Sequence, residues 1–148
     1  MADITKIATM DFEATALHRC MIYKDPDLVA GEAITKGQPC YIKPADGKTY
    51  KAVSTVLAGG SSDVTNLTAF HGFAYDTYAV GDKVSLVGPG GKMFYTAAAG
   101  LTPGALYYVS DTAGNVSDTA LVSHDAPIAF AVSDQSLVII EHAGGNLS

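Results

Sequence analysis

Three stretches of the chain share one pattern of glycine, apolar and turn positions. They are GQPCYIKPADGKTYKA (37–52), GDKVSLVGPGGKMFYTA (81–97) and GALYYVSDTAGNVSDTA (104–120). Each begins with a glycine, and a second glycine follows ten residues later, at Gly47, Gly91 and Gly114. An alternating or apolar run lies between the two glycines, and a second extended run follows. The pattern predicts strand, tight turn and strand, with positive φ in turns at Asp46-Gly47, Gly90-Gly91 and Gly114-Asn115.

The remaining pattern also predicts short strands. Segments 16–23, 70–76, 126–133 and 136–143 are rich in apolar, β-branched or aromatic residues and predict extended structure. Segment 52–68 permits either a short helix or a strand followed by a surface loop. Many short strands separated by turn residues predict an all-β fold, an antiparallel β-sandwich or β-barrel built from successive hairpins. We expect one such β-domain over residues 14–148.

Residues 1–13 differ because they lack a turn signal. Ile4, Ile7, Met10 and Phe12 alternate with polar residues there. The segment is either an ordinary edge strand or an extended N-terminal arm that reaches a neighbouring subunit. Apolar residues on an arm need a partner surface to leave water. These four residues are therefore candidate contacts with another subunit or a larger assembly.

Tyr107 is a fifth candidate contact. Tyr107 and Tyr108 place aromatic rings on both faces of one predicted strand. One face belongs to the core, and the other is surface or interface, where tyrosine is enriched. An aromatic residue that closes the end of a barrel is the alternative interpretation.

Composition limits the possible partners. The 148 residues suit one domain, and only 16% are charged, against about 25% in an average domain. So few charges suggest a surface that is partly covered by association. The net charge is −6 and the nine basic residues are scattered, which argues against binding nucleic acid. The N-terminus does not resemble a signal peptide and no run approaches the ~18 apolar residues of a membrane span, so we expect synthesis in the cytoplasm and no membrane partner.

The candidate chemical motifs are incomplete. Gly47-Lys48-Thr49 ends like a P-loop, but the first glycine of that motif would stand at position 42, where the chain has Ile42. His124-Asp125 has no accompanying nucleophile motif. Cys20 and Cys40 are too few for a disulfide framework, and His18 with Cys20 lacks a second pair of metal ligands. We therefore expect no catalytic residues, no cofactor and no metal.

Four segments carry a family resemblance. AGEAITKGQPCYIKPADGKTYKA (30–52), GFAYDTYAVGDKVSLVG (72–88), GLTPGALYYVSDTAGNVS (100–117) and APIAFAVSDQSLVII (126–140) resemble the small capsid decoration, or cement, proteins of tailed bacteriophages. The resemblance covers roughly residues 28–142. It implies an all-β module that forms a homotrimer, binds the major capsid protein on the outer capsid surface, bridges neighbouring capsomers and resists the pressure of packaged DNA.

Two other functional classes are also compatible with the sequence. A host-receptor or glycan-binding module of a phage head fibre or tail would show an exposed cluster of aromatic and carboxylate side chains on its loops. A small hydrolase or lyase would show a pocket that joins His71 or His124 to carboxylates.

Overall fold

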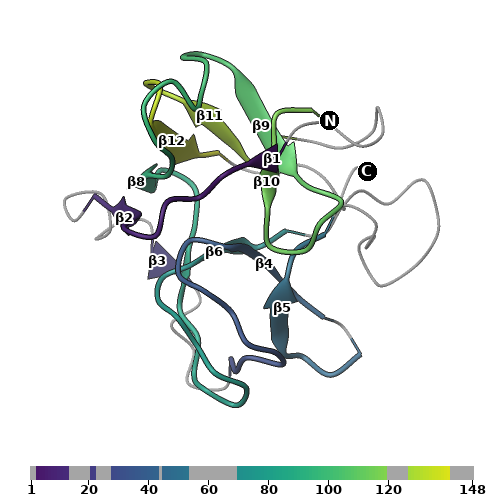
Figure 1. Ribbon diagram of the computed structural model, residues 1–148. Coiled ribbons are helices and arrows are strands. Elements are labelled where there is room, and N and C mark those ends of the chain that lie inside the picture. The colour runs from purple at the N-terminus through teal and green to yellow at the C-terminus, as the bar shows by residue number, and fades with distance from the viewer. Residues whose placement is uncertain are drawn as a thin grey trace.

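The computed structural model describes residues 3–13, 21–22, 28–43, 45–53, 70–119 and 127–140. Within these residues the chain forms β-strands and no helix (Figure 1). The strands are β1 (Asp3–Ile4), β2 (Asp11–Phe12), β3 (Met21–Ile22), β4 (Pro39–Ile42), β5 (Thr49–Lys51), β6 (Gly72–Ala74), β7 (Leu86–Val87), β8 (Lys92–Phe94), β9 (Leu106–Val109), β10 (Val116–Ser117), β11 (Ala129–Ala131) and β12 (Ser136–Ile139). The predicted all-β class is confirmed. The possible helix within 54–68 lies outside the described residues.

A seven-stranded antiparallel sheet has the order β1-β10-β9-β11-β12-β8-β2. Its first and last strands both come from the N-terminal segment, since β1 pairs with β10 and β2 pairs with β8. Only residues 5–10 connect these two edge strands, and in Figure 1 this purple segment crosses from β2 to β1. The sheet is therefore curled, and the N-terminal segment spans the gap between its edges.

A second, five-stranded antiparallel sheet has the order β3-β7-β6-β4-β5 and lies in the lower half of Figure 1. Backbone hydrogen bonds extend it beyond β5. Thr49 N–H donates to Val29 O (2.8 Å), and Ala30 N–H donates to Asp82 O (2.9 Å). Residues 28–31 thus link β5 to residues 81–84, which lead into β7, so this sheet also curls.

The five-stranded sheet has an apolar core on each face. Tyr41, Phe73 and Val87 belong to the main core, which they share with residues of the seven-stranded sheet. Their neighbours Cys40, Ala74 and Leu86 belong to a smaller core with Leu28, Ala30, Ile34 and Val84. Because successive strand residues point to opposite faces, a sheet with two cores needs continuous apolar runs rather than strict alternation. β6, with all three residues buried, fits this requirement.

Two of the three predicted hairpins are confirmed. β4 pairs with β5, and β9 pairs with β10. The predicted hairpin at 81–97 is wrong, because β7 pairs with β3 and β6 while β8 pairs with β12 and β2. The glycine turn between β7 and β8 carries the chain from one sheet to the other. A P-loop is also excluded at 47–49, since Lys48 lies in the β4–β5 turn and Thr49 begins β5.

The predicted turn glycines divide into two kinds. Gly47 and Gly114 have positive φ, of 70° and 81°, as predicted. Gly91 does not, and the positive φ of 94° belongs to Gly90 instead. Gly91 is required for packing, since a Cβ there would lie 2.5 Å from Val87 Cγ1.

The glycine that opens each repeat also has a structural role. All three have positive φ, and each occupies the third position of a turn closed by a backbone hydrogen bond. The glycines, with their φ values and hydrogen bonds, are Gly37 (84°, Gln38 N to Thr35 O), Gly81 (89°, Asp82 N to Ala79 O) and Gly104 (83°, Ala105 N to Thr102 O). The sequence repeat therefore has a structural counterpart in the turn that opens each copy.

Candidate docking face

The outer face of the seven-stranded sheet is the candidate site. Burial alternates along its central strands, as expected where one face packs on a core. Tyr107 and Val109 of β9 are buried, whereas Leu106 is exposed and Tyr108 is half-buried. In β12, Leu137 and Ile139 are buried and Val138 is half-buried. The same alternation places Phe130 of β11 and Phe94 of β8 on the outer face.

Strand register aligns these outer residues in two rows. In the first row, Leu106 lies opposite Phe130, which lies opposite Val138, and Val138 lies opposite Lys92. In the second row, Ser136 lies opposite Phe94, and Val132 N–H donates to Ser136 O (3.1 Å). We call Phe94, Leu106, Phe130, Val132 and Val138 the apolar face.

The apolar face is unusual for the outside of an antiparallel sheet, which is normally polar. Phe94 is 52% exposed, Leu106 46% and Val132 43%. Single exposed apolar residues are common, but a group spread over four neighbouring strands is typical of an interaction surface. Among the described residues, the apolar face is therefore the candidate surface for association.

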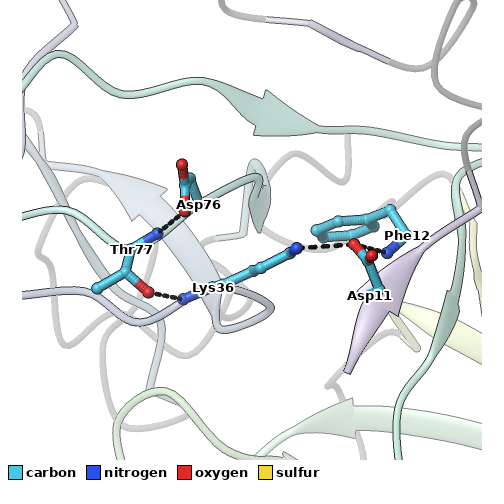
Figure 2. Close-up of polar contacts among 5 residues, drawn as sticks. All are labelled: Asp11, Phe12, Lys36, Asp76 and Thr77. Carbon is cyan, nitrogen blue, oxygen red and sulfur yellow. Dashed lines mark hydrogen bonds and ion pairs between the residues drawn. The ribbon is translucent and has the colours of Figure 1, made fainter. Parts of the chain in front are cut away.

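Ion pairs lie on the β2–β8 side of the apolar face. Lys92 Nζ lies 3.3 Å from a carboxylate oxygen of Glu13 and also lies over the Phe94 ring, 5.9 Å from its centroid. Lys36 Nζ lies 2.7 Å from Asp11 Oδ1 (Figure 2). The Lys36 hydrogen bond, followed by that from Phe12 N–H, lowers the pKa of the Asp11 carboxyl. Each acid on this side thus has a basic partner within the same chain.

The N-terminal candidate residues lie against the chain's own core. Met10 and Phe12 are 4% and 6% exposed, and Ile4 and Ile7 pack partly buried against the same core. The Met10 side chain lies against Gly37, where a Cβ would come 2.6 Å from its sulfur. This placement favours the edge-strand interpretation of residues 3–12 over a free arm.

Polar contacts hold the same segment to the five-stranded half of the molecule (Figure 2). Lys36, which pairs with Asp11, also donates its N–H to Thr77 Oγ1 (3.1 Å). Phe12 stacks on Tyr75 with ring centroids 6.2 Å apart. The N-terminal segment therefore contacts both halves of the fold.

The Tyr107 side chain points into the core, whereas a contact residue would have to lie on the outer face. It is 2% exposed, and its hydroxyl accepts a hydrogen bond from Thr102 N–H (2.9 Å). The outward residues of β9 are its neighbours Leu106 and Tyr108. A shift of one residue reverses the face of every strand side chain, and this shift explains the misplaced candidate.

Two of the other chemical candidates, His71 and Cys40, lie in the described part of the chain. His71 Nδ1 accepts a hydrogen bond from Ile42 N–H (3.0 Å), and burial raises the pKa of the Cys40 thiol. Within the described ranges, no three His, Cys, Asp or Glu side chains lie close enough together to hold a metal ion. Cys20, His18 and His124-Asp125 lie outside those ranges. Among the residues that are described, no helix has the length and apolar character of a membrane span.

An aromatic ring and a carboxylate meet at the β4–β5 turn. The Tyr50 hydroxyl donates to Asp46 Oδ2 (2.5 Å), and Lys43 Nζ lies 5.0 Å from the centroid of the Tyr50 ring. The aromatic ring and the carboxylate of this turn therefore contact each other and Lys43 within the chain.

No model of a known protein family matches this chain, and no curated protein matches it. The function must therefore be inferred from the residues and their geometry.

Proposed function

We propose that the chain is a structural virion protein, a capsid decoration or cement protein that binds the outer surface of a tailed-phage head as a homotrimer and stabilises the shell. It would be made in the host cytoplasm and would contact the major capsid protein and its own copies. The sequence resemblance over residues 28–142 suggests this role. The observation that carries the proposal is the apolar face, because an adhesive protein needs a surface that gains free energy by leaving water.

The strength of such a contact follows from exposure. Full burial of a Val, Leu or Phe side chain is worth about 1.5–3 kcal/mol. Phe94, Leu106 and Val132 are each about half exposed, so burying their remaining surface contributes roughly 1 kcal/mol apiece. A few kcal/mol per subunit makes a weak contact by itself. Three copies that dock together at a symmetric site would gain further affinity through avidity.

Rebinding to stripped capsids tests the proposal. Purified protein is mixed with phage shells from which this chain has been removed, and bound copies are counted. The wild type is expected to rebind in a fixed number per shell. The double variant Leu106→Gln/Val132→Gln is expected to lose at least tenfold in affinity, whereas Val80→Gln is expected to bind normally. Val80 is a suitable control because it is 67% exposed and lies in the turn at 79–82, outside the apolar face.

Two measurements distinguish self-association through the apolar face from binding to the capsid. Sedimentation equilibrium of the same variants reports self-association, and shell binding reports the capsid contact. Equal binding by the double variant and the wild type in both assays would overturn the role of the face. Failure of the wild type to bind shells, with binding to host cells instead, would overturn the decoration role and favour the receptor- or glycan-binding alternative.

A further inference from the structure

The β4–β5 turn contains Asp46 followed by Gly47, and because glycine has no side chain to shield its amide nitrogen, this dipeptide is open to backbone isomerisation. The Gly47 amide nitrogen can attack the side-chain carbon Cγ of Asp46. A bond forms between them, the amide loses its proton, the carboxyl loses an oxygen, and water leaves. Water then opens the five-membered ring at either carbonyl, which restores aspartate or moves the backbone onto the side chain as isoaspartate.

Hydrogen bonds within the turn hold both reacting groups, the Asp46 carboxylate and the Gly47 N–H. Asp46 Oδ1 accepts a hydrogen bond from Lys48 N–H (3.0 Å), and Asp46 Oδ2 accepts one from the Tyr50 hydroxyl (2.5 Å). Gly47 N–H donates to Lys43 O (2.8 Å). The carboxylate is therefore held toward Lys48 and Tyr50, and the attacking nitrogen is held toward Lys43. The Tyr50 and Lys48 bonds also lower the pKa of the Asp46 carboxyl, which favours the ionised and less electrophilic form.

The tyrosine itself is held in place by its surroundings. A Cβ on Gly31 would lie 2.3 Å from Tyr50 Cζ, so the absence of a side chain at position 31 lets the ring adopt its position. Lys43 lies over the ring, and Tyr41 packs with its ring centroid 6.2 Å from that of Tyr50. Gly31 and Asp46 thus contact the same tyrosine from residues far apart in the chain.

We propose that Asp46–Gly47 is a modification site for isoaspartate formation, and that the Tyr50 hydroxyl slows the reaction by holding the Asp46 carboxylate away from the Gly47 nitrogen. This inference does not depend on the decoration role. Isomerisation would lengthen the backbone inside a turn whose flanking residues Ile42 and Thr49 are paired, and would disturb that pairing.

Oxygen-18 incorporation measures the reaction directly, because each ring opening adds one oxygen from water. Native protein is incubated in H₂¹⁸O and then digested with trypsin in ordinary water. Trypsin does not cleave before proline, so Lys43-Pro44 stays intact and the peptide GQPCYIKPADGK (37–48) results. Asp46 is its only acidic side chain, and fragmentation in the mass spectrometer locates the label there.

The expected result is a rate about two- to tenfold higher in Tyr50→Phe than in the wild type, which corresponds to the loss of one ordinary hydrogen bond. Tyr108→Phe makes the same chemical change in another hairpin and should label at the wild-type rate. Gly31→Ala keeps the hydroxyl but displaces the ring, and should also accelerate labelling. Wild type unfolded in urea should label faster than native wild type. Equal rates for native Tyr50→Phe and wild type, or for native and unfolded wild type, would each overturn the proposal.

Discussion

Phe12 provides a direct test of how the N-terminal segment is used. Its side chain is 6% exposed, belongs to the main core and stacks on Tyr75. Truncating a buried Phe to Ala costs about 3–5 kcal/mol, through lost burial and the cavity left behind. β2 has only two residues and lies at the edge of its sheet, so the surroundings can partly relax, and we expect the lower end, about 3 kcal/mol. For a protein of this length, that corresponds to a melting temperature lower by roughly 6–12 °C.

Phe94→Ala is the matched control for Phe12→Ala. Phe94 lies on β8, the strand that pairs with β2, but its side chain is 52% exposed on the outer face. Its truncation should cost less than about 1 kcal/mol. The assay is urea unfolding followed by circular dichroism, with the slope m compared between variants to confirm a common unfolding transition. If Phe12→Ala shifts the unfolding free energy by no more than Phe94→Ala, residues 3–12 are a detachable arm and the edge-strand interpretation fails.

Two further predictions concern single positions and use the same unfolding assay. Gly47→Ala should cost about 1 kcal/mol, because φ is positive but a Cβ would meet open space. Gly114→Ala should cost about 2 kcal/mol, because its Cβ would also lie 2.7 Å from Nε2 of Gln38. The Gln38 side chain cannot easily move away, since its Oε1 accepts a hydrogen bond from Thr35 N–H. A smaller cost for Gly114→Ala than for Gly47→Ala would contradict this packing argument. Thr49→Val should be neutral or stabilise the protein by up to about 1 kcal/mol, because the buried Thr49 hydroxyl makes no hydrogen bond. A loss of more than about 1 kcal/mol in the free energy of unfolding would show that the hydroxyl has a partner.

Fold class was predictable from sequence because turn chemistry is local. A glycine with positive φ is specified by its immediate neighbours, so the turns at Gly47 and Gly114 could be placed from the dipeptides alone. Strand pairing is not local. The run from Val84 to Val87 contains three buried apolar residues and resembles one arm of a hairpin, yet it pairs with β3 and β6. Nothing in a strand–turn–strand pattern distinguishes a return within one sheet from a passage to another.

The candidate site was less predictable because both faces of β9 are apolar. In Leu106-Tyr107-Tyr108-Val109, no polar position marks the solvent side, so the pattern cannot tell which alternate residues face the core. Burial of Tyr107 resolves the ambiguity and assigns the outer face to Leu106 and Tyr108. The missing polar alternation was itself a signal, since a strand at the surface of a soluble sheet normally has one polar face.

The N-terminal segment also bears on how this protein would attach to a partner. An exposed strand edge offers unpaired N–H and C=O groups on which another chain can extend a sheet. Both edges of the seven-stranded sheet, β1 and β2, contain only two residues each, and short edge strands are poor templates for such addition. By contrast, each of the four neighbouring strands β8, β9, β11 and β12 has an apolar side chain on its outer face. Attachment through side chains of this face, rather than by strand addition at an edge, is therefore the mode that the fold favours. In that mode Leu106→Gln/Val132→Gln weakens binding, whereas strand addition at an edge would leave the affinity of this variant unchanged.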